Sequence, residues 1–428
     1  MNIRGSRWSM SRKRRRANPF FIILMVSLIG AGVYLNLAVI PNVPPLFMPT
    51  STPTTPPETY LTEAQSLESQ GKYYQAIQAY TLASRADPKN PANYLALARL
   101  NIYNGNYREA IINAENALLL NPNNSQAFAL RGFASGLMED YMAAQSSLNS
   151  ALEIDPMNAA AHAYQAEILA NLAVSSQGQP GQLDKAIEAS KQAESLAPNS
   201  LEAHRARGVV LEVTSNYDEA IQEFEAAIKI NPNIAFLHLA LGRNYRTNGD
   251  YPSAIEEFTR ANALIPSDPL PDTLISRTYV RTGDYAKALQ YAEAALKDDP
   301  LDPYSYGFIG LIYYYQGQYP FAAKYFRTAV QGGTASTGAV VNGLPIDQGR
   351  AGEFYYTFGL SLAKTGSCNE AIQIASLVQN TMLLNDVALG NANEIINICK
   401  NAPTAAPALQ NSTTTTPTAG GEVPAATP

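Results

Sequence analysis

Prolines recur at a fixed interval through most of this chain. The recurring positions are Pro88, Pro122, Pro156, Pro198, Pro232, Pro266 and Pro300. Their spacings are 34, 34, 42, 34, 34 and 34 residues. A constant period of this kind indicates a repeat protein, in which each unit packs on its neighbours. The 428 residues therefore need no single central core, although length alone would suggest roughly two or three domains.

Small residues recur inside the same units, twelve positions apart. The pairs are Ala98 with Ala110, Gly132 with Ala144, Gly208 with Ala220, Gly242 with Ala254, Ser276 with Ala288, and Gly310 with Ala322. A short turn that ends in Tyr lies between the two members of most pairs, for example at 105–107, 249–251 and 283–285. Glycine commonly ends a helix, and small side chains let two helices approach closely. Each unit is therefore predicted to be a pair of antiparallel helices.

These repeated positions resemble the tetratricopeptide repeat family over about residues 57–400. The resemblance implies an all-α, right-handed solenoid whose concave groove is lined mainly by the first helix of each pair. We expect nine units, which begin near Pro57, Pro91, Ser125, Ala159, Leu201, Ala235, Pro269, Pro303 and Gly352. Eight extra residues in unit four, near 175–182, predict a surface loop, and the glycine-rich residues 332–338 predict another. A capping helix is expected over 386–400, which closes an array that spans 58–400.

An uncharged apolar run over 20–40 predicts a transmembrane helix, because 21 helical residues span roughly 30 Å. Residues 1–16 carry seven basic side chains and no acidic one, and the next basic residue is Lys72. The positive-inside rule then leaves 1–19 in the cytoplasm and exports the rest. A cleaved signal peptide is the alternative, although its apolar region is usually shorter. Either segment would place the array outside the cytoplasmic membrane.

Two segments are too polar and too rich in proline to form a core. Residues 41–57 predict an extended Pro/Thr-rich linker, and 401–428 predict a disordered Thr/Pro/Ala-rich tail. Two cysteines, Cys368 and Cys399, would meet if a helix over 368–383 and the capping helix run antiparallel. An exported pair should oxidise to a disulfide. The alternative is two buried thiols.

No enzyme, cofactor or metal site is expected. The sequence lacks the common catalytic and phosphate-binding motifs. His162, His204 and His238 occupy one equivalent place in three successive units, where the family usually has a packing residue, so we interpret them as packing groups. Adjacent acids such as Glu256 and Glu257 are expected to be solvated. After residue 16 the chain has 23 basic and 36 acidic side chains, which argues against nucleic acid as a partner.

Partner binding is expected in the groove. The geometry that the resemblance implies selects one set of side chains in units five to eight. They are Arg205, Arg243, Arg246, Arg277, Arg281, Tyr304, Leu311, Tyr314 and Tyr315. Arginine forks pair well with carboxylates and tyrosine gives rigid contact area, so the strip would suit an acidic protein or peptide segment. Alternatively, these arginines pair inside the array with neighbours such as Glu212 and Glu223.

Taken together, the sequence predicts a membrane-anchored extracytoplasmic scaffold that binds another protein. One alternative is an envelope assembly factor that recognises a glycan or lipid-linked sugar through the groove tyrosines. Another is a carrier that only positions a partner enzyme. Groove residues vary with the ligand on a common framework, so the partner stays unnamed.

Overall fold

The computed structural model describes residues 18–39 and 56–401. The chain forms two compact units, which divide between Pro56 and Pro57. The basic tail, most of the linker and nearly all of the C-terminal tail expected from the sequence lie outside the described residues.

The first unit contains helix α1 (Pro19–Tyr34), which continues into a π-helical turn, η1 (Leu35–Val39). Asn18 caps the helix, since its side chain accepts a hydrogen bond from the N–H of Phe20 at 3.1 Å. The span Pro19–Leu37 is long and apolar enough to cross a membrane. Its side chains are exposed within this unit, as an apolar helix without a protein partner requires.

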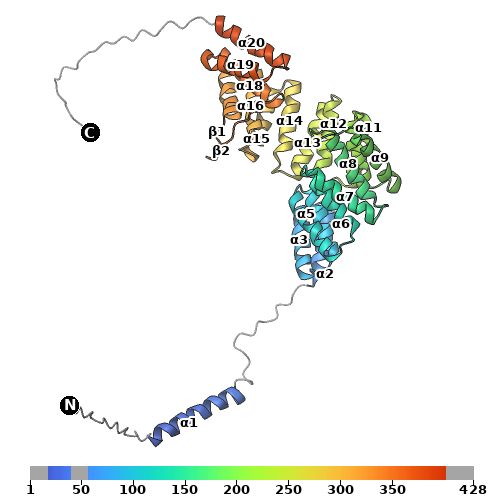
Figure 1. Ribbon diagram of the computed structural model, residues 1–428, viewed down its shortest axis with the longest axis vertical. Coiled ribbons are helices and arrows are strands. Elements are labelled where there is room, and N and C mark those ends of the chain that lie inside the picture. The colour runs from blue at the N-terminus through green and yellow to red at the C-terminus, as the bar shows by residue number, and fades with distance from the viewer. Residues whose placement is uncertain (1–17, 40–55, 402–428) are drawn as a thin grey trace, which may run out of the picture. The chain divides into compact units, whose positions relative to one another are not determined.

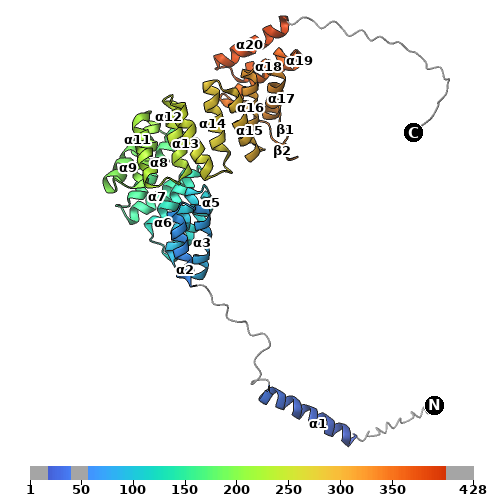
Figure 2. The same ribbon diagram turned by 180° about the vertical axis from the view of Figure 1, so that it is seen from behind.

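Over residues 57–401, the second unit is a row of nine helix pairs followed by one further helix, α20 (Asp386–Asn401), in chain order (Figures 1 and 2). The pairs are α2 (Pro57–Ser69) with α3 (Tyr73–Ala86), α4 (Pro91–Tyr103) with α5 (Tyr107–Leu120), α6 (Ser125–Leu137) with α7 (Tyr141–Ile154), α8 (Ala159–Val174) with α9 (Gln182–Leu196), α10 (Leu201–Val213) with α11 (Tyr217–Ile230), α12 (Ala235–Thr247) with α13 (Tyr251–Leu264), α14 (Pro269–Thr282) with α15 (Tyr285–Asp298), α16 (Pro303–Tyr315) with α17 (Tyr319–Gln331), and α18 (Arg350–Lys364) with α19 (Cys368–Thr381). This is the predicted all-α solenoid with a terminal helix.

The recurring prolines mark the starts of the first helices for a local reason. Two residues after six of the seven prolines stands a capping side chain that accepts a hydrogen bond from the first helical turn. These caps are Asn90, Asn124, Asn158, Ser200, Asp268 and Asp302. Ile234 is the exception and has no side-chain cap. Eight of the nine expected units begin at the predicted residue, whereas α18 begins earlier, at Arg350.

In several pairs, a glycine of the first helix faces a large side chain of the second helix. A Cβ atom at Gly208 would lie 2.8 Å from the ring of Phe224, and one at Gly242 would lie 2.5 Å from Phe258. Both phenylalanines are fully buried. Close packing therefore requires glycine at these two positions.

Both departures from the repeat are ordered. The insertion of unit four forms a loop between Val174, where α8 ends, and Gln182, where α9 begins. The stretch after α17 differs from the expected loop, because it contains a short antiparallel hairpin of β1 (Gly333–Thr334) and β2 (Val340–Val341). The hydroxyl of Tyr355 donates to the carbonyls of Val330 and Leu344, which fastens this connection to α18.

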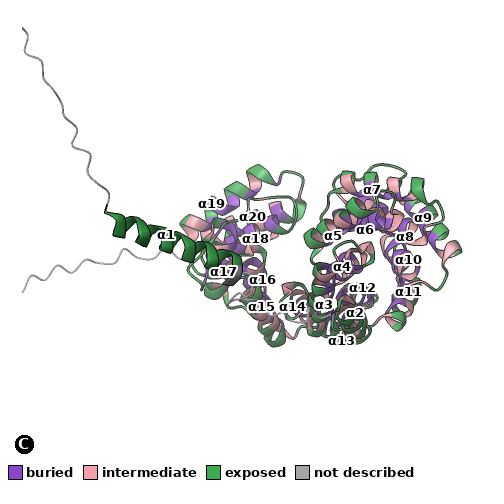
Figure 3. Cartoon of the chain, turned by 90° about the horizontal axis from the view of Figure 1, so that it is seen from below, coloured by how far each residue is buried: buried purple, intermediate pink, exposed green. Residues whose placement is uncertain are grey.

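The first pair also contacts a part of the array four units away. The Tyr73 hydroxyl donates to Oδ1 of Asn231 at 2.8 Å. Gly71 lies against Asn233, so closely that a Cβ atom there would meet its side chain at 2.2 Å. In Figure 3, which looks along the vertical axis of Figure 1, α2 and α3 overlap α12 and α13 in the view. Units one to six therefore curl until the α2–α3 turn reaches the connection between α11 and α12.

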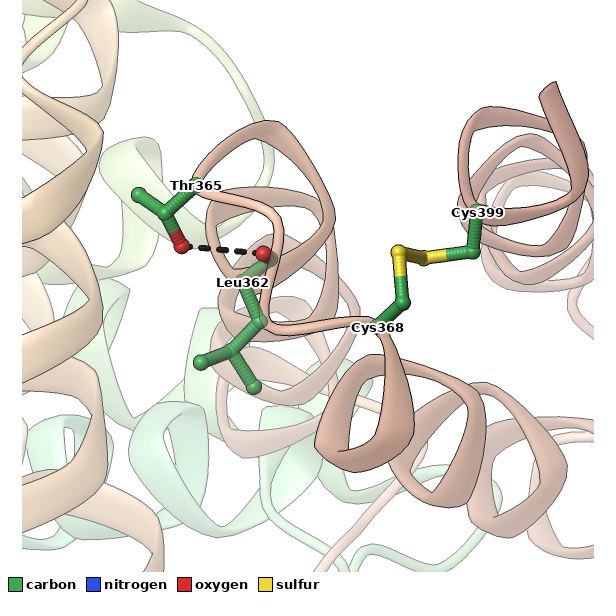
Figure 4. The surroundings of a disulfide bond; sticks show 4 residues. All are labelled: Leu362, Thr365, Cys368 and Cys399. Atoms are coloured by element: carbon green, nitrogen blue, oxygen red, sulfur yellow. Dashed lines mark hydrogen bonds between the residues drawn. A yellow bond between two sulfur atoms is a disulfide. The ribbon is translucent and has the colours of Figure 1, made fainter. Parts of the chain in front are cut away.

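At the other end, α20 packs on α18 and α19 and buries Ala388, Ala392 and Ile395. Cys368 at the start of α19 and Cys399 near the end of α20 form a disulfide, with their Cα atoms 5.3 Å apart (Figure 4). Helix α19 ends at Thr381, slightly earlier than the expected 383. The terminal helix is thus held both by its apolar face and by a covalent link.

Candidate functional site

A pocket of about 320 Å³ opens where the first helices of units six to nine, α12, α14, α16 and α18, lie next to one another. We call it the arginine pocket. Its lining residues are Arg246, Arg277, Val280, Arg281, Phe308, Leu311, Tyr315, Arg350 and Glu353. Each helix contributes at least one side chain, so the pocket exists only in the assembled array.

Positive charge in this pocket is poorly compensated. Four guanidinium groups face one carboxylate, and the Nε of Arg350 lies 3.7 Å from that carboxylate, Glu353. Within residues 18–39 and 56–401, Arg246, Arg277 and Arg281 form no salt bridge. The Nε of Arg277 is buried and has no hydrogen-bond partner in the same part of the chain. A buried donor of this kind favours a bound acceptor.

The crowding of like charges affects the arginines themselves. Burial lowers the pKa of Arg246, and the positive charges of Arg281, Arg243 and Arg350 lower it further. Burial also lowers the pKa of Arg277, with Arg350 and Arg246 adding to the effect. Because guanidinium groups keep their proton in proteins, the crowding persists until an anion relieves it.

An apolar wall completes the pocket. Phe308 and Leu311 of α16 are buried, and the Tyr315 side chain is about half exposed. The Tyr315 ring stacks on Tyr285, with centroids 5.9 Å apart. The guanidinium of Arg277 lies 5.4 Å from the centroid of Phe308. The pocket thus offers cations beside a rigid aromatic and aliphatic surface, which suits a segment with both acidic and apolar side chains.

Two of the arginines expected in the groove are engaged inside the array instead. Arg205 is buried, with its Nε 2.9 Å from Oε2 of Glu167 and its guanidinium 4.4 Å from the ring centroid of Phe133. Arg243 makes two hydrogen bonds to Glu212, at 2.9 and 3.2 Å. Arg205 is therefore no surface residue, because side chains of units three and four surround it. Arg243 has the internal partner that the alternative interpretation named.

The remaining expected residues divide between the arginine pocket and its surroundings. Leu311 and Tyr315 line the pocket with the other three arginines. Tyr304 lies outside it and packs edge-on against Phe354, and Tyr314 packs against Tyr315 and Tyr319. Sequence reasoning missed Val280, Phe308, Arg350 and Glu353. Glu353 could have been found by extending the groove positions to unit nine, whereas Arg350 precedes the expected start of that unit.

The three histidines belong to the packing of the units. His238 is buried, and its Nε2 lies 2.8 Å from the carbonyl oxygen of Pro232 while its Nδ1 lies 2.6 Å from Glu257. The Nε2 of His162 contacts the carbonyl oxygen of Pro156 in the same way. In two other units a tyrosine hydroxyl donates to the equivalent carbonyl, from Tyr94 to Pro88 and from Tyr306 to Pro300. Glu257, expected to be solvated, is buried, and its pairs with His238 and Arg260 compensate the cost of that burial.

Replacing His238 with Phe should lower the free energy of unfolding by roughly 1–3 kcal/mol, because it leaves the buried Glu257 and the Pro232 carbonyl without their shared partner. His162→Phe is the matched control, since His162 makes a single hydrogen bond in a more exposed place. Urea unfolding followed by circular dichroism measures both. Equal losses for the two variants would contradict this role of His238.

Comparison with known proteins agrees with the helix pairs. The family model described as tetratricopeptide repeat matches residues 61–127, 172–233 and 273–338. The chain is a tetratricopeptide repeat protein. Proteins of this architecture present extended concave surfaces for binding. No curated protein matches the chain.

Several solved structures are similar to parts of the chain. PilW, described as a widely conserved type IV pilus biogenesis factor, is 23% identical, with 48% of this chain and 91% of that chain covered and a TM-score of 0.42. The pilF protein of Pseudomonas aeruginosa is 20% identical over 47% and 88% of the two chains, with a TM-score of 0.39. A tetratricopeptide repeat protein from Parabacteroides merdae is 17% identical over 60% and 98%, with a TM-score of 0.38.

Proposed function

We propose that this protein is a membrane-anchored scaffold that holds a partner protein outside the cytoplasmic membrane, through the groove of units six to nine. The observation that carries the proposal is the arginine pocket, where Arg246, Arg277 and Arg281 lack salt bridges in the described part of the chain. Arg205 and Arg243, which lie outside the pocket, have such partners. The proposal includes no catalytic step.

The membrane part of the proposal rests on the N-terminal segment. Helix α1 is apolar along its whole length, seven basic residues precede it, and no basic residue follows until Lys72. This asymmetry favours an N-terminus in the cytoplasm and an array on the other side. The disulfide supports the same side, because disulfides persist mainly in oxidising compartments.

The partner segment is proposed to be acidic with an apolar side chain nearby. A carboxylate that enters the pocket replaces arginine–arginine repulsion with charge-assisted hydrogen bonds, including one to the buried Nε of Arg277. Phe308, Leu311 and Tyr315 supply the surface for the apolar neighbour. Internal aromatic contacts of Tyr304 and Tyr314 leave less of the groove for a stacked sugar ring, so a protein ligand is favoured here.

Photo-crosslinking tests this assignment. A photoreactive phenylalanine analogue at position 315 should yield a discrete protein adduct in intact cells, whereas the same analogue at position 74, an exposed tyrosine of α3, should not. Arg281→Glu should abolish the adduct by placing a like charge against an acidic segment, and Arg85→Glu, the same change on exposed α3, should leave it. Protease added outside the cytoplasmic membrane of spheroplasts should degrade the adduct.

Three outcomes would contradict the proposal. An adduct of equal yield from positions 315 and 74 would remove the groove from partner binding. Retention of the adduct in Arg281→Glu would remove the arginine pocket. Protection of the adduct from external protease until the membrane is lysed would overturn the topology.

A further inference from the structure

The loop inserted in unit four forms a second pocket, of about 280 Å³, between α7, α8 and α9. We call it the amide pocket. Its lining residues are Gln145, Asn149, Gln165, Leu169, Gln179, Pro180, Gln182 and Lys185. Five of the eight side chains are carboxamides, and none is a carboxylate. The arginine pocket has the opposite character, so the two sites suit different ligands.

The inserted loop is held in place by its own hydrogen bonds. The N–H of Gln179 donates to Oε1 of Gln182 at 2.8 Å, and the Ser175 hydroxyl donates to the carbonyl of Leu172. Gly178 lies so close to α8 that a Cβ atom there would be 2.6 Å from the carbonyl oxygen of Ala173. The wall that the loop adds to the pocket is therefore largely pre-formed, which reduces the entropy lost on binding.

The carboxamides of the helical side of the pocket are available to a ligand. Between residues 56 and 401, the side chains of Gln145, Asn149 and Gln165 form no hydrogen bond with other protein groups. Each carboxamide presents donors and an acceptor in one plane. Neighbouring hydroxyl groups on a sugar ring need this combination, because each hydroxyl both donates and accepts.

We propose that the amide pocket is a binding site for a neutral saccharide. Leu169, which is buried, and Pro180 supply apolar atoms that the C–H face of a sugar ring can cover. Lys185 is the one charged group, and a strongly ionic ligand would find little compensation there. Multiple carboxamides beside a small apolar surface, in a pre-formed hollow, match the mixed polar and apolar character of a sugar ring. This site is independent of the partner groove.

The repeat itself provides a test variant. Deletion of 175–182 restores the 34-residue period of the other units, so the array should keep its helical circular dichroism while losing the pocket wall. The full chain is titrated with maltohexaose, cellohexaose, xylohexaose and chitohexaose by calorimetry, in a detergent without a sugar headgroup. Saturable binding of at least one oligosaccharide below about 1 mM is expected, and the deletion should abolish it.

Point variants keep the test decisive if the deletion disturbs folding. Gln165→Ala should weaken binding by about tenfold, because it removes a bidentate carboxamide from the pocket. Gln192→Ala, on an exposed face of α9 outside the pocket, is the matched control and should bind as the parent does. Absence of binding by all four oligosaccharides, or equal binding by the deletion or Gln165→Ala variant, would overturn the proposal. A protein adduct from position 165 in place of sugar binding would identify a peptide site instead.

Discussion

Replacement of Arg205 by Met is expected to lower the free energy of unfolding by about 3–5 kcal/mol. The change leaves the Glu167 carboxylate, which is 1% exposed, without its ionic partner in the interior of the array. It also removes the guanidinium that lies against the rings of Phe133 and Tyr164. Urea unfolding monitored by circular dichroism gives the loss directly.

The loss should depend on pH in a defined direction. Burial raises the pKa of Glu167 above its ordinary value of 4.5, and Arg205 offsets part of that rise. Without Arg205 the pKa rises further. The carboxyl is protonated in both folded and unfolded states well below pH 4.5, so the variant's deficit is small there. It grows only as the pH rises through the raised pKa of Glu167 in the folded parent, because the carboxyl then ionises beside Arg205 in the parent but stays protonated in the folded variant, while the unfolded chains titrate alike.

Arg207 provides the matched control for this prediction. It pairs with Glu194 and Glu223, but its side chain is 37% exposed. Arg207→Met should therefore cost less than about 1 kcal/mol. The double variant Arg205→Met, Glu167→Leu should recover much of the lost stability, since it removes the stranded charge together with its partner. A loss for Arg205→Met no larger than that for Arg207→Met would contradict the role of the buried pair.

Loss of the disulfide should have the next largest effect, confined to the end of the array. The bond joins cysteines 31 residues apart, and the chain-entropy model gives about 3–4 kcal/mol for a loop of this size. Cys399→Ser should therefore increase hydrogen exchange in peptides from α20, which otherwise relies on three buried side chains, Ala388, Ala392 and Ile395.

Peptides from α2 and α3 serve as the internal reference, because they lie at the opposite end of the row of pairs and should exchange as in the parent protein. Dithiothreitol should produce the same change in the parent protein and no further change in Cys399→Ser. Unaltered exchange of α20 after reduction would mean that packing alone holds the terminal helix.

The fold was predictable because its determinants are local. Six of the seven closing prolines are followed by a capping residue, and glycines such as Gly208 and Gly242 of the first helix meet a large side chain of the second, so a short stretch of sequence identifies a helix pair. Unit nine was expected to begin near Gly352, and α18 begins slightly earlier, at Arg350, because the segment before it contains a hairpin instead of the usual proline and cap. No periodic signal marks a boundary in such a segment.

The candidate site was less predictable because it depends on how the units curve. Arg205 and Arg277 were both expected to face the groove, yet one is buried against Glu167 and the other lines the arginine pocket. Their difference arises from side chains of other units, which the curl of units one to six brings close or leaves apart. Small rotations between successive pairs add up over the array, and single residues do not encode that sum.

The contact of the α2–α3 turn with Asn231 and Asn233 restricts how many repeats this part of the array can contain. In an open solenoid, a unit can be duplicated or lost without disturbing the others. Here Gly71 touches Asn233 only because the intervening units complete a fixed amount of turn. Gain or loss of one unit would carry the two surfaces apart by at least a helix diameter, about 10 Å. Such a change would have to be compensated at both surfaces. The number of repeats between them is therefore fixed by the contact that they make.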